Sequence, residues 1–127
     1  MCQLNGIGME SKLKREGLVG YRVVKIERNI MSSLWPHAKR TLFDFSVYTI
    51  GKTHKATGEM KYNIAGIYNN TGFHAFYTYA EALKQRSNVK GHSIVRCRMY
   101  GNATVYTNGL RAERMKIEAI VCGRRLK

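Results

Sequence analysis

Residues 70–85 decide the expected fold, and they read Asn70-Thr71-Gly72-Phe73-His74-Ala75-Phe76-Tyr77-Thr78-Tyr79-Ala80-Glu81-Ala82-Leu83-Lys84-Gln85. The first part alternates, which predicts a short strand with Phe73 on one face and His74 on the other. Thr78 is followed three residues later by Glu81, a spacing typical of a capping box at the start of a helix. The stretch therefore predicts a strand, a tight turn and one helix of about three turns.

Strand patterns surround this unit on both sides. Residues 20–27 are rich in β-branched side chains and apolar on both faces, which is typical of a central strand. Residues 93–100 alternate between apolar and basic side chains, and Asn108-Gly109 is a tight-turn signal because both residues tolerate positive φ. Weaker or shorter strand patterns lie at 41–48, 60–68, 103–107 and 114–121. Between two glycines, residues 51–58 form a polar, basic turn region.

Together these patterns predict an α+β fold. The expected architecture is a mostly antiparallel, curved sheet of five to seven strands, with one main helix at about 78–87 packed on it. The 127 residues suffice for one core but not for two. We expect a flexible or short-helical arm over 1–17, a single globular domain over 18–122 and a basic tail over 123–127.

Cationic residues dominate the charge balance. The chain has 22 Lys and Arg against 8 Asp and Glu, a formal net charge of +14. The segment up to Met60 holds 10 basic and 5 acidic residues, and the remainder holds 12 and 3, so the second half carries most of the excess. Such an excess predicts attraction to a polyanion, either a nucleic acid or an acidic protein surface. The alternative interpretation is a solvated basic surface that aids solubility.

Neither a metal site nor a disulfide framework is expected. The four histidines lack metal-ligand spacing, and Cys2, Cys97 and Cys122 are an odd number without a close pair. No apolar run reaches the length of a membrane span, and residues 1–8 lack the features of a secretory signal. We expect reduced thiols and a cytoplasmic protein.

A cluster of basic residues is the main candidate site. Arg96 and Arg98 share one face of their strand, and Arg114 and Lys116 share the polar face of the last one. If these strands pair, four cations stand on one sheet surface and form an anion-binding face, and Tyr100 adds a ring on which a base stacks. Lys25 in the first predicted strand completes the candidate set. The alternative is the ordinary solvated face of an antiparallel sheet.

Several short motifs resemble a family of small bacteriophage and bacterial proteins that has no assigned activity. They are the opening Met1-Cys2, the strand Gly20-Tyr21-Arg22-Val23-Val24, the segment Gly72-Phe73-His74-Ala75-Phe76 before a helix, and Arg111-Ala112-Glu113 before the last strand. The resemblance covers about the last hundred residues and implies a phage protein acting inside a bacterial host cell.

A second resemblance is to the ADP-ribosyltransferase fold. It rests on the glycine, aromatic residues and alanine-rich helix of residues 72–83 and on Glu113, which falls where that family keeps its catalytic glutamate. The resemblance implies an NAD-dependent enzyme with Arg22, His74 and Glu113 as site residues. The chain departs from that family by lacking a Ser-Thr-Ser segment. On residue chemistry alone, a histidine at the edge of an aromatic cluster is more often a hydrogen-bonded structural residue than a catalytic one, and this is the preferred interpretation of His74.

The leading hypothesis is a non-enzymatic binding protein without a cofactor. It would engage nucleic acid or a host ribonucleoprotein through its basic face, for example as an inhibitor of a host defence complex in the manner of an anti-CRISPR protein. The alternatives are NAD-dependent ADP-ribosyl transfer and a structural component of a virion.

Overall fold

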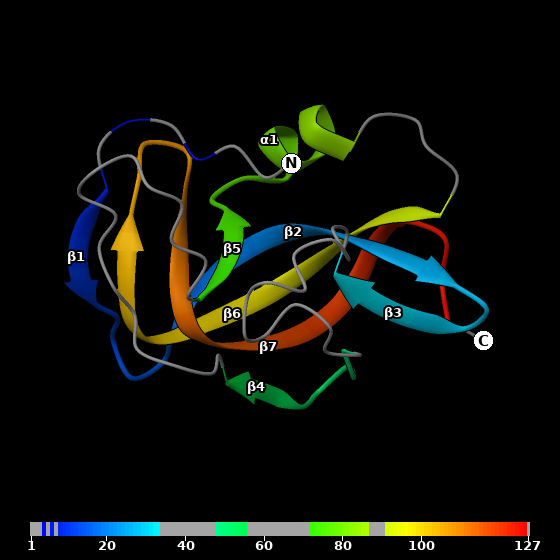
Figure 1. Ribbon diagram of the computed structural model, residues 1–127, viewed down its shortest axis with the longest axis horizontal. Helices are drawn as coiled ribbons and strands as arrows, with labels where there is room; N and C mark the ends of the chain where they lie inside the picture. Colours follow the sequence, from blue (N-terminus) through cyan, green and yellow to red (C-terminus); the bar gives the residue numbers. More distant parts are fainter. Residues whose placement is uncertain are drawn as a thin grey trace.

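The computed structural model describes residues 4, 6, 8–33, 48–55, 72–86 and 91–126. Strand patterns at 41–47 and 60–68, and Cys2, lie outside these residues. The one helix of the described part is α1 (Tyr79–Arg86). Its strands are β1 (Met9–Lys12), β2 (Leu18–Glu27), β3 (Ile30–Ser33), β4 (Thr53–Lys55), β5 (Phe73–Phe76), β6 (His92–Val105) and β7 (Gly109–Gly123), as Figure 1 shows.

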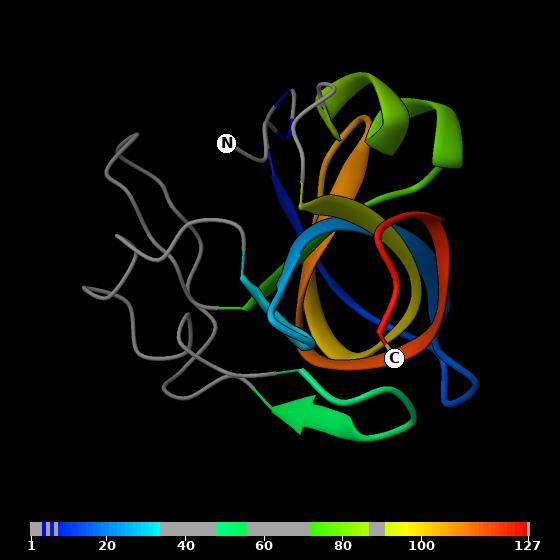
Figure 2. The same cartoon turned by 90° about the vertical axis from the view of Figure 1, so that its right-hand side faces the viewer.

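The strands form one sheet that closes on itself. Its order is β1-β6-β2-β5-β7-β4, with β3 beside β2, and β6 also pairs with β7. Strands β6, β2, β5 and β7 therefore complete a ring of antiparallel pairs. Figure 2 looks along this ring and shows β2, β6 and β7 curving round a common interior.

The expected α+β class is wrong, because the sheet dominates the fold. An α+β domain needs its helices to cover the apolar face of an open sheet. Here the ring of strands encloses that face itself, and α1 is only eight residues long with Ala82 as its buried residue. The helix covers a small outer cluster of Val23, Phe76 and Ile94 rather than the main core.

The main core lies inside the ring and is built by the alternation seen in the sequence. Phe73 and Ala75 of β5 face it, whereas Phe76 packs under α1 on the other side. The inward side chains of β2, β6 and β7 complete it, including Val24, Ile26, Val95, Cys97, Met99, Leu110, Ala112, Met115 and Ile117. Both faces of β2 are thus apolar because the strand separates two clusters.

The β6–β7 hairpin curves because its ladder is interrupted. The strands have 14 and 15 residues, and their register shifts at three places. At one of these, Gly101 and Asn102 oppose Glu113 alone, and Gly101 has a φ of 86°. A glycine with positive φ is the usual start of a β-bulge, which bends the strand and increases its twist. The predicted strands 93–100 and 103–107 are consequently one bent strand.

Two tight turns of the described residues join neighbouring antiparallel strands. The predicted turn at Asn108-Gly109 joins β6 to β7, and the Tyr106 N–H donates to the Gly109 carbonyl at 2.8 Å. Positive φ values occur instead in the β2–β3 hairpin, at Arg28 (53°) and Asn29 (63°). Two residues with positive φ between paired strands are typical of a type I′ turn.

The start of α1 agrees with its predicted cap. The Glu81 N–H donates to Oγ1 of Thr78 at 3.2 Å, which confirms the N-cap. At its other end the helix is tied to β6, because Nε of Arg86 donates to the His92 carbonyl at 3.2 Å. Nδ1 of His92 lies 3.2 Å from the Arg86 carbonyl.

Three segments differ from the sequence-based expectations. Residues 9–12 within the expected arm form β1, which pairs with residues 102–105 of β6. Residues 53–55 within the expected turn region form β4, which pairs with β7. The tail is held at three points: the Ser93 hydroxyl donates to the Arg124 carbonyl at 2.7 Å, Nη1 of Arg125 donates to the Ile120 carbonyl at 2.9 Å, and Leu126 packs against the main core. In the described part of the chain, no helix is long and apolar enough to cross a membrane.

Candidate anion-binding surface

The outer face of the β6–β7 hairpin brings four predicted cations together. Arg98 lies opposite Lys116 and Tyr100 lies opposite Arg114 in the register of the two strands. Arg96 is two residues before Arg98 and so shares its face. We refer to Arg96, Arg98, Tyr100, Arg114 and Lys116 as the basic face. All five side chains retain solvent exposure.

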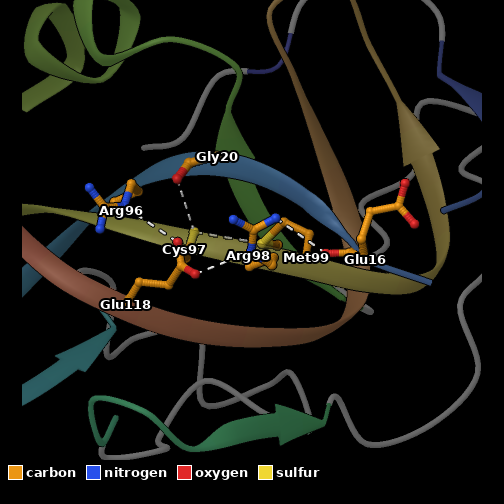
Figure 3. Close-up of polar contacts among 7 residues, drawn as sticks. All are labelled: Glu16, Gly20, Arg96, Cys97, Arg98, Met99 and Glu118. Carbon is orange, nitrogen blue, oxygen red and sulfur yellow. Dashed lines mark hydrogen bonds and ion pairs between the residues drawn. The ribbon is translucent and has the colours of Figure 1, made fainter. Parts of the chain in front are cut away.

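A carboxylate lies within this face because of a β-bulge. Arg96 pairs with Ala119 and the next residue, Cys97, pairs with Ile117, so Glu118 is the extra residue between them. Its carboxylate lies between two guanidinium groups, as Figure 3 shows. Nε of Arg98 donates to Oε2 at 3.1 Å and Nε of Arg96 donates to Oε1 at 3.4 Å. The two arginines are therefore held at fixed positions.

The ion pairs also act on the protonation of Glu118. Burial raises the pKa of its carboxyl group, but the hydrogen bonds and charges of Arg98 and then Arg96 outweigh burial and leave the pKa below its ordinary value. Glu118 is therefore a carboxylate at neutral pH. It offsets part of the positive charge of the basic face.

Arg98 also links the basic face to the connection between β1 and β2. Its Nη1 donates to the backbone carbonyl of Glu16 at 3.2 Å. Gly17 packs beside it: a Cβ atom there would lie 2.8 Å from Cγ of Arg98 and 2.8 Å from Cε1 of Tyr100. Behind this contact, the Cys97 thiol points inward and lies 3.4 Å from the Gly20 carbonyl (Figure 3).

A cleft of about 420 Å³ opens at one end of the basic face. Tyr100 and Gly101 of β6 line it, and cationic side chains from other parts of the chain stand around them. These cations are Lys12, Lys14 and Arg15 from β1 and the connection that follows, and Arg114 from β7. Figure 1 shows this connection passing beside the bend of β6 and β7. We refer to this space as the Tyr100 cleft.

Sequence reasoning missed the cations of the cleft that precede β2. Lys12, Lys14 and Arg15 fall within the predicted flexible or short-helical arm, although their closeness in sequence is itself a signal of a charged surface. The Leu13 N–H donates to the Gly101 carbonyl at 2.9 Å and fixes them against β6. Lys55 of β4 lies within the predicted turn region over 51–58, and its pairing with Arg114 extends the positive surface.

Lys25 is not part of this surface. It pairs with His92 near the start of β6, whereas Val19 at the other end of β2 pairs with Arg98. Its Nζ lies 3.6 Å from Oε2 of Glu27 on the same strand. The predicted set thus divides into a compact group on the β6–β7 hairpin and a distant lysine.

The residues proposed for an enzyme are placed in two groups. Nη1 of Arg22 donates to the His74 carbonyl at 2.7 Å, so these two residues are brought together. The Glu113 carboxylate lies 3.9 Å from Nη2 of Arg114 and against Gly101. The charges that act on the His74 ring are those of Arg22 and Arg111, and Glu113 instead borders the basic face.

Arg22 belongs to a buried polar cluster. Its Nη2 donates to the Tyr48 hydroxyl at 3.1 Å, and its guanidinium carbon lies 5.6 Å from the centre of that ring. The Tyr48 ring meets His54 edge to face, with centres 5.3 Å apart, and Nε2 of His54 accepts the Thr49 N–H at 3.1 Å. The pKa of His54 is lowered, mainly by burial. The ring is therefore neutral, and its Nε2 can accept the hydrogen bond from the Thr49 N–H.

His74 lies beside the same cluster. Its side chain keeps some accessible surface, although protein atoms surround it densely. Burial first, and then the charges of Arg22 and Arg111, lower its pKa to about 3. Arg111 is opposite His74 in the register and is itself buried. A ring that stays neutral beside two arginines is consistent with a structural role for His74, which is one of the two roles considered from the sequence.

Searches against protein-family models, curated proteins and solved structures find no match. Among the described residues, no three His, Cys, Asp or Glu side chains are grouped in a way that would hold a metal ion.

Proposed function

We propose that this protein binds nucleic acid through the basic face and the Tyr100 cleft. The observation that carries the proposal is the convergence of cations from three separate segments around one partly exposed tyrosine. Lys12, Lys14 and Arg15 come from one side, Arg114 and Lys116 from β7, and Lys55 from β4. Such a group offers many contacts to phosphates spaced along a strand.

Charge supports binding to a polyanion in two ways. The net charge of +14 provides long-range attraction, and the basic face concentrates part of it on one hairpin. Arginine suits phosphate because its planar guanidinium donates two parallel hydrogen bonds. Glu118 holds Arg96 and Arg98 through Nε, which orients both guanidinium groups before a ligand arrives.

The aromatic ring distinguishes nucleic acid from other polyanions. An acidic protein surface would satisfy the cations equally well, but a tyrosine among phosphate-binding side chains also supplies a stacking surface for a base. Tyr100 lies directly opposite Arg114 on the outer face, so a base on the ring and a phosphate on the guanidinium fit one ligand. No side chain of the basic face is placed to require a particular base, so we expect weak sequence dependence.

The test is the salt dependence of binding to a labelled single-stranded oligonucleotide of about 12 nucleotides, measured by fluorescence anisotropy. Each lost phosphate contact lowers the slope of log K against log salt by about 0.7 for a single strand. The double variant Arg114→Gln/Lys116→Gln should therefore bind more weakly and with a slope lower by about 1.4.

A matched control removes the same charge elsewhere. Lys84 on α1 and Arg124 after β7 have exposed side chains away from the basic face. Lys84→Gln/Arg124→Gln should leave the slope close to that of the parent. Equal slopes in the two double variants, or the absence of binding by the parent, would overturn the proposal.

A second experiment separates nucleic acid from acidic protein as the partner. The protein is used to capture partners from a bacterial lysate, with and without nuclease treatment. Nucleic acid recovered only without nuclease supports the proposal, whether it is free or part of a ribonucleoprotein. Capture of the same proteins after complete digestion of nucleic acid would identify an acidic protein surface instead.

A further inference from the structure

The Tyr100 cleft carries an inference about the kind of nucleic acid, and this inference rests on the proposed function. The cleft is not a flat part of the basic face: its volume of about 420 Å³ is within the range of clefts that hold small molecules, about 300–1,000 Å³. It therefore has room for a single nucleotide rather than only for the edge of a phosphate backbone.

Two glycines allow the chain to pack closely on either side of Tyr100. Gly17 and Gly101 have φ values of 79° and 86°, and a Cβ atom at either position would collide with its neighbours. At Gly17 the Cβ would meet the Met99 carbonyl oxygen, Cγ of Arg98 and Cε1 of Tyr100, so the connection after β1 packs against the backbone of β6 and the edge of the ring. At Gly101 the bulge bends β6 immediately after Tyr100.

The cations stand on two sides of the ring, where the phosphates flanking a stacked base would lie. Arg114 lies across the strand pair from Tyr100, and Lys12, Lys14 and Arg15 stand on the opposite wall. A base stacked on the ring would have its flanking phosphates near one wall or the other. In a duplex the base faces are covered by neighbouring base pairs, so only an unpaired base reaches the ring.

We infer that the Tyr100 cleft binds one unpaired base of a single-stranded nucleic acid by stacking on Tyr100, with the neighbouring phosphates held by Arg114 and by Lys12, Lys14 and Arg15. Single-stranded DNA and RNA share the required chemistry, and an oligothymidine and an oligouridine probe of equal length distinguish them by relative affinity.

The test compares ligands as well as variants. The probes are a labelled oligothymidine of about 12 nucleotides, an abasic strand of the same length and a duplex of the same length. Stacking on one aromatic ring is worth about 5- to 150-fold in affinity. We expect the oligothymidine to bind tighter than the abasic strand by a factor in that range, and tighter than the duplex at equal salt.

The variants Tyr100→Leu and Tyr100→Phe distinguish a loss of base stacking from a loss of folding. Tyr100→Phe keeps the stacking surface and should bind like the parent. Tyr100→Leu should lose about 5- to 150-fold toward oligothymidine while binding the abasic strand and the duplex unchanged. Thermal unfolding of both variants checks that they are folded, and the abasic strand tests the inference on the unaltered protein.

Failure of this inference differs from failure of the proposed function. Equal affinity of the parent for oligothymidine, abasic strand and duplex, with a normal salt slope, would overturn the stacking cleft and leave nucleic-acid binding in place. No binding to any probe would overturn both.

Discussion

Oε2 of Glu118 lies 3.1 Å from Nε of Arg98 on the neighbouring strand. This pair depends on the β-bulge that places Glu118 as an extra residue of β7, between the partners of Arg96 and Cys97. The carboxylate orients the guanidinium and also opposes the field that a phosphate would experience. Orientation of the guanidinium should favour phosphate binding, whereas the negative charge should weaken it. A substitution that removes the charge tests the second effect.

Removing the charge of Glu118 while keeping its shape should strengthen nucleic-acid binding. Glu118→Gln keeps the shape of the side chain and one oxygen that accepts from one of the two arginines, but it no longer offsets their charge. Since exposed ion pairs are worth about 0–1 kcal/mol, we expect binding to an oligonucleotide at low salt to tighten by up to about five-fold. The control is Glu27→Gln, which removes the same charge beside Lys25. Equal tightening in both variants would point to net charge alone.

Substitution of Gly17 should disturb both stability and the Tyr100 cleft. A Cβ atom at Gly17 would lie 2.7 Å from the Met99 carbonyl oxygen and 2.8 Å from Cε1 of Tyr100. Gly51 has a similar φ of 86° but no neighbouring atoms within 4 Å, so it is a matched control. Gly51→Ala should cost about 1–2 kcal/mol of unfolding free energy from backbone strain.

Gly17→Ala should cost measurably more than Gly51→Ala in urea unfolding, because steric overlap adds to the same strain. It should also weaken oligonucleotide binding, since the connection that carries Lys14 and Arg15 must move away from Tyr100. Identical unfolding free energies for the two variants would show that this contact is not tight in solution.

The unfolding free energy should fall as the pH is lowered, because folding lowers the pKa of His74. Its pKa is about 3 in the folded protein and about 6.5 in an unfolded chain. Between these values the unfolded chain takes up a proton that the folded protein does not. The stabilisation is therefore complete above about pH 6.5 and falls toward pH 3 by about 1.4 kcal/mol per pH unit.

Replacing His74 by Gln removes this titration. The difference in unfolding free energy between parent and His74→Gln should shrink or reverse as the pH is lowered from about 7 to about 4.5. Urea unfolding at intermediate pH values measures it. Parallel pH profiles of the two proteins would show that folding does not lower the pKa of the ring.

The helix cap should contribute to stability independently of binding. Oγ1 of Thr78 accepts the Glu81 N–H, and loss of an N-cap side chain costs about 1 kcal/mol. Thr78→Ala should lower the unfolding free energy by that amount, and Thr78→Ser, which keeps the hydroxyl, should not. Oligonucleotide affinity should be unchanged in both variants, because α1 lies over the Val23, Phe76 and Ile94 cluster rather than the basic face. A Thr78→Ser variant as unstable as Thr78→Ala would remove the hydroxyl from the explanation.

Local patterns predicted the individual elements where one period was clear. The alternation of β5 predicted that Phe73 and Phe76 lie on opposite faces, which the structure assigns to the main core and to the cluster under α1, and Thr78 marked the start of α1. β1 was missed because Met9–Lys12 is exposed along its whole length and has no apolar face to reveal it. Only its backbone pairing with β6 makes it a strand.

The candidate site was predicted in part. Arg96, Arg98, Arg114 and Lys116 belong to strands whose alternation shows that they point outward, so their common face needed only the pairing of two strands. Lys25 shares the same kind of pattern but lies at the far end of β2. A residue's position along a strand relative to a distant strand depends on register, which side-chain alternation does not specify.

By itself, the amino-acid sequence determined which segments are strands of strong alternation, where the helix begins, and that the protein carries a large positive charge. These properties depend on neighbours within a few residues of each other. Tertiary structure alone decided that the sheet closes through β6–β7 and β2–β5 pairing, that Glu118 enters the basic face at a bulge, and that Lys12, Lys14 and Arg15 meet Tyr100. Closure and register depend on hydrogen bonds between residues far apart in the chain, whose free energy is shared by the whole ladder and cannot be assigned to any one segment.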